Sequence, residues 1–237
     1  MPGAGPGRKI TIDTSSPRRA LVVALAGLLL LTGCNTRTGG ESSSETAAVD
    51  PRAFKPSKTN KDPSKDIKGV VMTRYKPGHA RPGQRVAYDT FPPYGGQHDP
   101  YWADCSGTVY AKAVRNENMV HAMEHGAVWI AYDPARVRGG ALQALAAKVD
   151  GQPYLMLSPY PKLDVPVSVQ SWGHQLKVPR PDDPRVDQFI AALRANPYTT
   201  PESGAPCGTN PASFDITNPP PLDPSPPGPD AAPVQGP

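Results

Sequence analysis

The sequence contains one dense group of residues that could do chemistry, His121-x-x-Glu124-His125. Residues three and four positions apart share a face of an α-helix, so these three side chains would point the same way on a helix. Two imidazoles at positions i and i+4 can bind one transition-metal ion. In an extended strand the two histidines would still share a face, whereas Glu124 would point away. The spacing therefore predicts a metal site in either conformation.

Further residues extend this predicted site. His98 lies in a turn-rich loop and is the third candidate ligand. Met119 and Met123 are close in sequence, and a thioether beside imidazole favours copper over zinc. We therefore expect one copper or zinc ion at His121, His125 and His98 with Glu124.

Two histidines are expected to lie elsewhere. His79 is at the edge of a linker and His174 follows a glycine, so both are expected at the surface. The alternative to a metal is that His121 and His125 hydrogen-bond to carbonyls or carboxylates in a polar core, because buried polar side chains need such partners.

The order His-x-x-Glu-His is also that of inverted zinc peptidases. In that interpretation Glu124 is the general base, His121 and His125 bind zinc, and Glu202 is available as a distal carboxylate ligand. Other catalytic patterns have little support, because the chain has no Gly-x-Ser-x-Gly motif and no glycine-rich phosphate loop. We expect a binding protein more than an enzyme.

The elements that must position these residues follow from hydrophobic periodicity and from Gly, Pro and Asn signals. Asn116 is expected to cap a helix that Gly126 ends, and the strand predicted at 165–172 alternates valines with polar residues, which suits one solvated face. The expected helices are 117–125, 137–149 and one that begins near 184; the expected strands are 108–110, 127–132, 154–158, 165–172 and 175–178. This order predicts a small α+β domain, a mixed sheet with helices packed on it.

The N-terminal residues are typical of a signal peptide that is removed from the mature protein. Residues 20–31 form an uncharged apolar run which, as a helix, reaches about 18 Å, too short for a bilayer core of about 30 Å. Leu31-Thr32-Gly33-Cys34 follows it and resembles the lipobox of bacterial lipoproteins, in which the Cys is lipidated and the chain is cut before it. We expect residues 1–33 to be a signal peptide and Cys34 to carry lipid such as palmitate. The protein would then be extracytoplasmic and anchored to the cell membrane. Arg18-Arg19 also resembles part of a twin-arginine export signal.

Composition places the remaining boundaries. Removal of residues 1–33 takes away four of the 25 basic and one of the 21 acidic residues, so the net charge falls from +4 to +1 and no nucleic-acid partner is indicated. Proline accounts for 32 of the 237 residues, and 10 of these lie in residues 208–237. We expect a flexible linker at 34–68, the α+β domain at 69–207 and a disordered Pro-rich tail at 208–237.

Cysteine content adds one tertiary restraint. If Cys34 carries lipid, Cys105 and Cys207 remain, and an exported protein occupies an oxidising compartment. These two cysteines are therefore expected to form a disulfide.

Several motifs resemble a bacterial family, the domain-of-unknown-function family 3105. They are Tyr88 with Pro92-Pro93 through Gly96-x-His98, Trp102-x-x-Cys105, Val120-His121-x-Met123-Glu124-His125-Gly126-Ala127-Val128-Trp129, Ser158-Pro159-Tyr160-Pro161, Trp172-Gly173 and Gly204-Ala205-Pro206-Cys207. The resemblance covers about residues 86–207 and fixes no activity. The resemblance implies that His79 and His174 lie outside the family motifs, whereas these residues occupy motif positions: His98, His121, Glu124, His125, Cys105 and Cys207.

A different function class also fits the sequence. The Pro-rich loop contains Tyr88, Phe91, Tyr94, Tyr101 and Trp102, and aromatic faces suit sugar rings. The domain could therefore be an interaction module of the cell envelope that contacts a cell-wall polymer or an envelope protein.

Overall fold

The structure of the protein is a computed structural model that describes residues 49–235. The predicted signal peptide, Cys34 and most of the first half of the predicted linker lie outside these residues. Along the described chain the elements are η1 (Pro51–Phe54), η2 (Pro63–Asp66), β1 (Val70–Met72), β2 (Gly78–His79), β3 (Val86–Ala87), β4 (Gln97–His98), β5 (Ser106–Val109), α1 (Asn116–Glu124), β6 (Val128–Tyr132), α2 (Gly139–Val149), β7 (Leu155–Pro159), β8 (Val167–Ser171), β9 (His174–Val178), α3 (Arg185–Leu193) and β10 (Ala232–Pro233).

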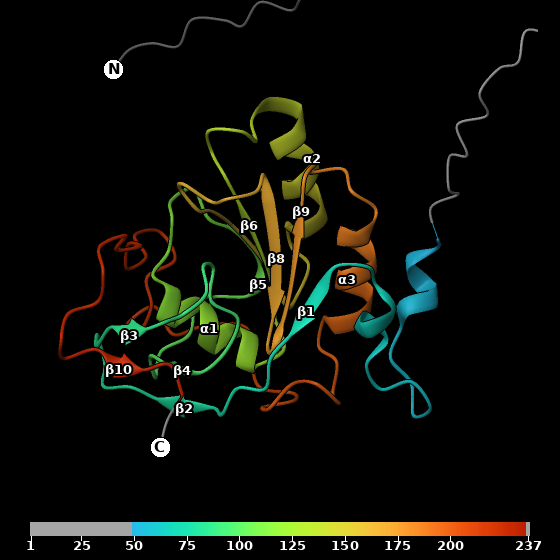
Figure 1. Cartoon of the computed structure of the whole chain (residues 1–237). Helices are drawn as coiled ribbons and strands as arrows, with labels where there is room; N and C mark the ends of the chain where they lie inside the picture. Colours follow the sequence, from blue (N-terminus) through green and yellow to red (C-terminus); the bar gives the residue numbers. More distant parts are fainter. Residues whose placement is uncertain (1–48, 236–237) are drawn as a thin grey trace, which may run out of the picture. The chain divides into compact units, whose positions relative to one another are not determined.

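A six-stranded mixed sheet forms the centre of the fold, in the order β1-β9-β8-β6-β7-β5 (Figure 1). Strands β5, β7 and β6 pair in parallel, whereas β8, β9 and β1 add in antiparallel register. Helices α1 and α2 connect the parallel strands, as parallel pairing requires a crossover connection. The predicted α+β class, with helices packed on a mixed sheet, is confirmed.

The two faces of the sheet carry different side chains. Helices α2 and α3 cover one face, which we call the aliphatic face; its strand residues are Val128, Ile130, Leu155, Leu157, Val167, Val169, Leu176 and Val178. Helix α1 covers the opposite face, which we call the mixed face; its strand residues include Trp129, Ala131, Met156, Ser158, Ser168, Gln170 and Gln175. Figure 1 shows α1 and α3 on opposite sides of the sheet.

The expectation that the strand at 165–172 has one solvated face is wrong. All five residues of β8 are buried, because α3 covers its valines and the α1 side covers its polar residues. The polar side chains of the mixed face bond to each other and to the backbone. Ser168 donates to Gln170, and Trp129 Nε1 donates to Ser158 Oγ at 2.9 Å. The polar half of the alternating pattern therefore marks a second buried surface and not solvent.

The part of the predicted linker that the structure describes is folded. Two short 3-10 helices, η1 and η2, pack against α3. Ile67 is buried in the aliphatic core, and Asn196 Nδ2 donates to the Lys61 carbonyl at 2.9 Å. The folded part of the chain therefore includes residues 49–68, about twenty residues that composition assigns to the linker.

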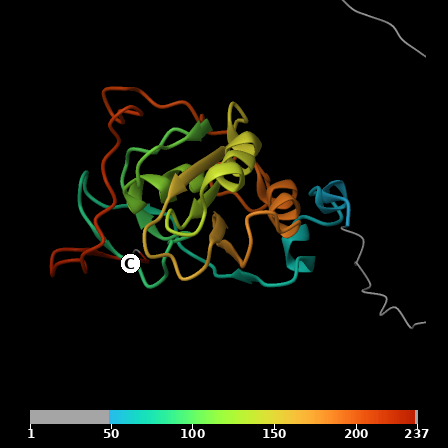
Figure 2. The same cartoon turned by 90° about the horizontal axis from the view of Figure 1, so that it is seen from above.

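The Pro-rich segment 208–235 is extended, as its composition indicates, but it is not disordered. Phe214 is buried against Tyr110, and β10 pairs in parallel with β3. The Leu222 amide donates to the Ala113 carbonyl at 3.1 Å. In Figure 2 this segment lies at the end of the domain away from α3. The expectation of a disordered tail was wrong because scattered apolar residues and backbone groups suffice to attach a chain that has no helix or strand period.

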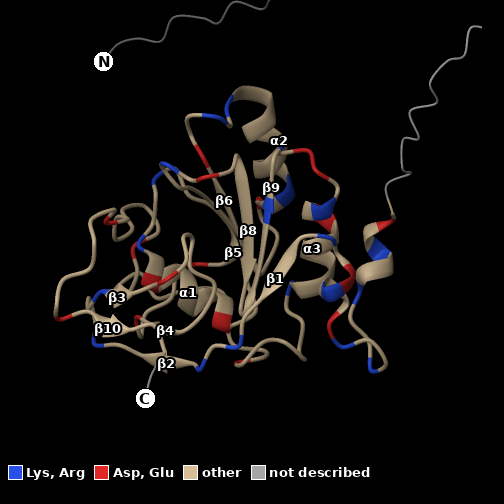
Figure 3. Ribbon diagram, in the orientation of Figure 1, with Lys and Arg blue, Asp and Glu red and all other residues tan. Residues whose placement is uncertain are grey.

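The disulfide expected between Cys105 and Cys207 is present, with the Cα atoms 4.7 Å apart and 102 residues of separation. It fixes the start of the C-terminal segment to the start of β5. Basic and acidic residues are interspersed along the described ribbon (Figure 3). Among the described helices, none is long and apolar enough to cross a membrane.

Candidate functional site

Helix α1 carries the central residues of the site, and its end is set by Gly126. The Gly126 amide donates to the Met123 carbonyl at 3.0 Å and the Ala127 amide to the Ala122 carbonyl at 3.1 Å. This is a Schellman pattern, which requires a left-handed residue after the helix, and Gly126 has φ +104°. The predicted helix and its glycine stop are confirmed, although Asn116 is the first helical residue and not the cap. His121 and Glu124 thus lie on one helix face, with His125 at its end.

Three histidines are oriented by the backbone in the same manner. The Nδ1 atoms of His98, His121 and His125 lie 2.9, 2.6 and 2.8 Å from the carbonyl oxygens of Gly96, Asp99 and Pro206, respectively. A carbonyl oxygen can only accept, so each Nδ1 carries the proton and donates it. Each neutral ring therefore has its lone pair on Nε2, the arrangement of a histidine whose other nitrogen binds a metal.

The donor atoms converge at two adjacent positions. His79, His98, His121 and Glu124 each offer one donor atom, and these atoms all lie within 4.8 Å of one another. His121, His125 and Glu202 form a second group within the same limit. His121 belongs to both groups. The structure therefore brings together all four predicted ligands but divides them between two overlapping sets.

His98 lies at the centre of the first group. It is fully buried, and its Nε2 lies 2.8 Å from Glu124 Oε2. With the His98 proton on Nδ1, neither Nε2 nor the carboxylate oxygen can donate, so Nε2 has no hydrogen-bond partner within the described residues. A buried polar atom without a partner is costly. A cation placed between the imidazole lone pair and the carboxylate would satisfy both atoms.

Burial sets the protonation of the central imidazoles. Desolvation lowers the pKa of His121 to about 3, and it also lowers the pKa of His125, in each case against the effect of the carbonyl hydrogen bond. Burial opposes ionisation of Glu124, but the contact with His98 and attraction to the neighbouring imidazoles outweigh it and lower the pKa of this carboxyl. At neutral pH the lowered pKa values leave His121 and His125 as neutral imidazoles and Glu124 as a carboxylate.

The remaining histidines differ from expectation in opposite ways. His79 is exposed as expected, yet β2 pairs with β4 so that His79 lies opposite His98, with ring centroids 4.9 Å apart. No spacing signal could have found it, because it joins the site through a two-residue strand pairing. His174 was expected at the surface but is buried, where it donates to the Trp172 carbonyl and lies 3.3 Å from Asp62 Oδ2.

The expected thioether ligands do not fit the helix geometry. Met119 and Met123 each stand two residues from His121, which places them on the opposite side of a helix with 3.6 residues per turn. Both are fully buried in the apolar cluster of the mixed face. The donor set therefore consists of imidazole and carboxylate, which suits zinc or copper(II) and gives no support for a soft copper(I) site.

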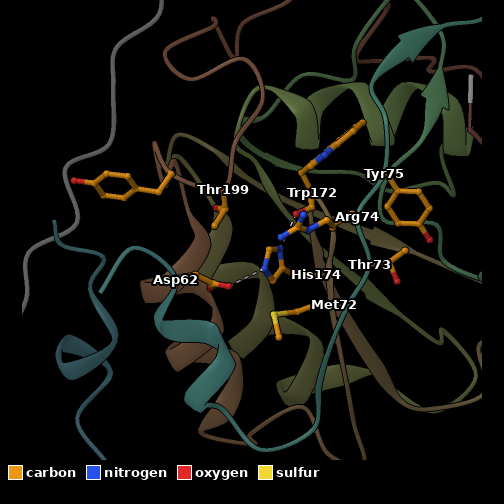
Figure 4. A pocket seen from close by; sticks show the side chains of 10 residues that line it. Asp62, Met72, Thr73, Arg74, Tyr75, Trp172, His174 and Thr199 are labelled. Atoms are coloured by element: carbon orange, nitrogen blue, oxygen red, sulfur yellow. Dashed lines mark hydrogen bonds and ion pairs between the residues drawn. The ribbon is translucent and has the colours of Figure 1, made fainter. Parts of the chain in front are cut away.

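Two tryptophans form walls of the site. The Trp102 ring lies 5.4 Å from that of His121 and 4.8 Å from that of His125, and the Trp172 ring lies 5.8 Å from that of His98. Trp172 also lines a cavity of about 660 Å³ that contains the His174–Asp62 pair (Figure 4). The site and this cavity therefore share one wall.

The aromatic loop is mostly internal. Tyr88 and Tyr94 are buried, and Trp102 packs on the histidines, which leaves Phe91 and Tyr101 exposed. The loop aromatics thus shape the site more than they form a continuous binding surface. This weakens the case for an aromatic sugar-binding face.

Burial limits what the cluster can do chemically. The exposed fractions of His121 and Glu124 are 4 and 3 %, so a polypeptide substrate has little access to the would-be base and metal. Glu124 also lies within ligand distance of the donor group and not apart from it, as a general base would. The geometry favours ion binding over peptide hydrolysis.

The family model "Protein of unknown function (DUF3105)" matches residues 79–209. The chain belongs to this family. Comparisons with curated proteins and with solved structures give no match.

Proposed function

We propose that this protein is a membrane-anchored, extracytoplasmic lipoprotein whose domain binds one divalent transition-metal ion, with zinc the best fit and copper(II) the main competitor. The ligands are His98, His121 and Glu124 from the buried cluster, with His79 as the exposed fourth donor. Four donors of this kind are the usual set for a closed zinc site.

One observation carries this proposal. His98 and His121 donate their Nδ1 protons to backbone carbonyls, which leaves their Nε2 lone pairs free within the group of donor atoms that includes Glu124. A polar core without a metal would be expected to use both ring nitrogens as hydrogen-bond partners, as His174 does with Trp172 and Asp62. The buried, unpartnered Nε2 of His98 favours a metal over that alternative.

Elemental analysis of the purified full-length chain after incubation with zinc, and separately with copper(II), tests the proposal. We expect about one ion per chain for the wild type. His121→Ala should lose the ion. His174→Gln is the matched control, because it removes a buried imidazole outside the cluster and should retain the ion. A His121→Ala protein with full metal content would refute the site.

The lipid anchor is proposed from the lipobox at Cys34 and is consistent with the Cys105–Cys207 disulfide, which indicates an oxidising compartment. Expression of the full chain in a bacterium with labelled palmitate tests it. The wild type should incorporate label and partition with membranes, whereas Cys34→Ala should do neither. Equal membrane partition of both proteins would contradict the anchor.

A further inference from the structure

A second set of donors lies beside the proposed metal site. His125 Nε2 is 3.4 Å from Glu202 Oε2, and both join His121 within the 4.8 Å group. We call this group (His121, His125 and Glu202) the outer set and the group of His79, His98, His121 and Glu124 the inner set. The Glu202 side chain is 49 % exposed, whereas the inner set is buried apart from His79. The two sets therefore differ in their access to solvent.

The segment that carries Glu202 is held in place. The Glu202 amide donates to the Glu124 carbonyl at 3.1 Å, and Tyr154 donates to the Ala205 carbonyl at 2.9 Å. The Pro206 carbonyl orients His125, and the next residue is the disulfide-bonded Cys207. The position of Glu202 beside His125 is thus fixed by four independent contacts on a short stretch of chain.

His121 restricts how the two sets can be used. Its Nδ1 is committed to the Asp99 carbonyl at 2.6 Å, and its ring packs against Trp102, so the ring cannot turn. Only Nε2 is free, and one lone pair binds one ion at a time. With His121 bound, the outer set (His121, His125 and Glu202) offers three protein ligands and the inner set (His79, His98, His121 and Glu124) offers four. The inner position is therefore the stable one and the outer position the transient one.

We propose that His121, His125 and Glu202 form a loading position for the metal ion, from which the ion moves to His98, Glu124 and His79 without leaving His121 Nε2. This rests on the proposed function. The exposed Glu202 carboxylate attracts the hydrated cation, as local charge of opposite sign raises association rates. The ion then exchanges Glu202 and His125 for the inner ligands. No covalent or redox step is involved.

Loading and release kinetics test this relay. Zinc would be added to the metal-free full-length chain in a stopped-flow instrument, with tryptophan fluorescence as the readout because Trp102 contacts both His121 and His125. For Glu202→Gln we expect about 10-fold slower loading. Release to a chelator should slow by a similar factor, because the equilibrium affinity of the inner site is unchanged. His79→Ala should instead weaken affinity and leave the loading rate near that of the wild type.

Asp182→Asn is the matched control, because it removes the same charge from a side chain that is 77 % exposed and pairs with Arg180, outside both donor sets. Its loading rate should equal that of the wild type. Wild-type loading rates in Glu202→Gln, with one ion still bound, would overturn the relay and leave the metal site standing. Two ions per chain would overturn it in favour of two simultaneous sites. Absence of any ion in the wild type would remove the metal site itself.

Discussion

The two faces of the central sheet are built from the same strands but bury different kinds of side chain. The aliphatic face buries valine, isoleucine and leucine against α2 and α3. The mixed face buries glutamine and serine beneath α1 and the Pro-rich loops, which themselves carry the buried histidines and Glu124. Burial of apolar side chains on the aliphatic face stabilises the fold. Burial of polar groups on the mixed face costs free energy unless they are paired, so the first contribution offsets the second. The pleat of single strands separates the two roles, because alternate side chains point to opposite faces of the sheet.

The largest expected effect is on the aliphatic face. Leu157 is fully buried in β7, so Leu157→Ala should lower the free energy of unfolding by about 2–5 kcal/mol through lost burial and a residual cavity. Urea denaturation of the metal-free chain measures this. Metal affinity of the folded protein should not change. Leu157→Met is the control and should cost about 1.5 kcal/mol or less. A loss of metal binding in folded Leu157→Ala would show that the faces are coupled.

The disulfide tests how strongly the mixed face depends on its covalent link. Replacing both Cys105 and Cys207 by Ala should lower the free energy of unfolding by about 2–5 kcal/mol, because it frees a loop of 102 residues in the unfolded chain. Urea denaturation again gives the value, and reduction of the wild type should reproduce it. Metal loading should also slow, since Pro206 would no longer be held against His125. A change below about 1 kcal/mol would mean that packing of the C-terminal segment replaces the bond.

A bound metal ion should stabilise the folded protein through its ligands on the α1 side of the sheet, and substitutions on the aliphatic face should not change this effect. With zinc at about 100 times its Kd, the free energy of unfolding should rise by about 2.7 kcal/mol, because the ion binds the folded chain only. Thermal or urea unfolding with and without zinc measures this. His121→Ala should show no increase, whereas Leu157→Met should show the full increase. Equal stabilisation of His121→Ala would place the ion elsewhere.

The smallest expected effect concerns pH and the helix beside the aliphatic face. Hydrogen bonds from Arg185 lower the pKa of Asp183 below its usual value. A lowered pKa in the folded state stabilises the protein above the ordinary carboxyl pKa of about 3.9, and this stabilisation is lost as the pH falls through the folded pKa. Asp183→Asn should therefore cost less than about 1 kcal/mol at pH 7 and nothing near pH 2. The difference between wild type and variant across pH 2–7 measures it; a difference that grows toward low pH would contradict the sign.

Local pattern predicted much of the fold. The helical period of Leu142, Leu145 and Val149 places α2, and Gly126 ends α1 as expected. The alternation of apolar and polar residues gave a wrong prediction where the packing of other elements on a strand decides which side chains are buried. Alternation in β8 has the period of a half-solvated strand, and only the presence of layers on both sides makes its polar residues internal. Likewise, proline content indicates extended chain but carries no information on whether that chain finds a surface to pack on.

The candidate site shows the same division. Helical spacing alone places His121, Glu124 and His125 together, because i, i+3 and i+4 positions share a face. The number of cysteines also predicts the Cys105–Cys207 disulfide, because the sequence has two cysteines besides Cys34. Only the tertiary structure decides that His79 and His98 face each other across β2 and β4, that Glu202 reaches His125, and that Met119 and Met123 turn into the core. The physical reason is that spacing fixes neighbours within one element, whereas contacts between elements depend on how their faces are buried.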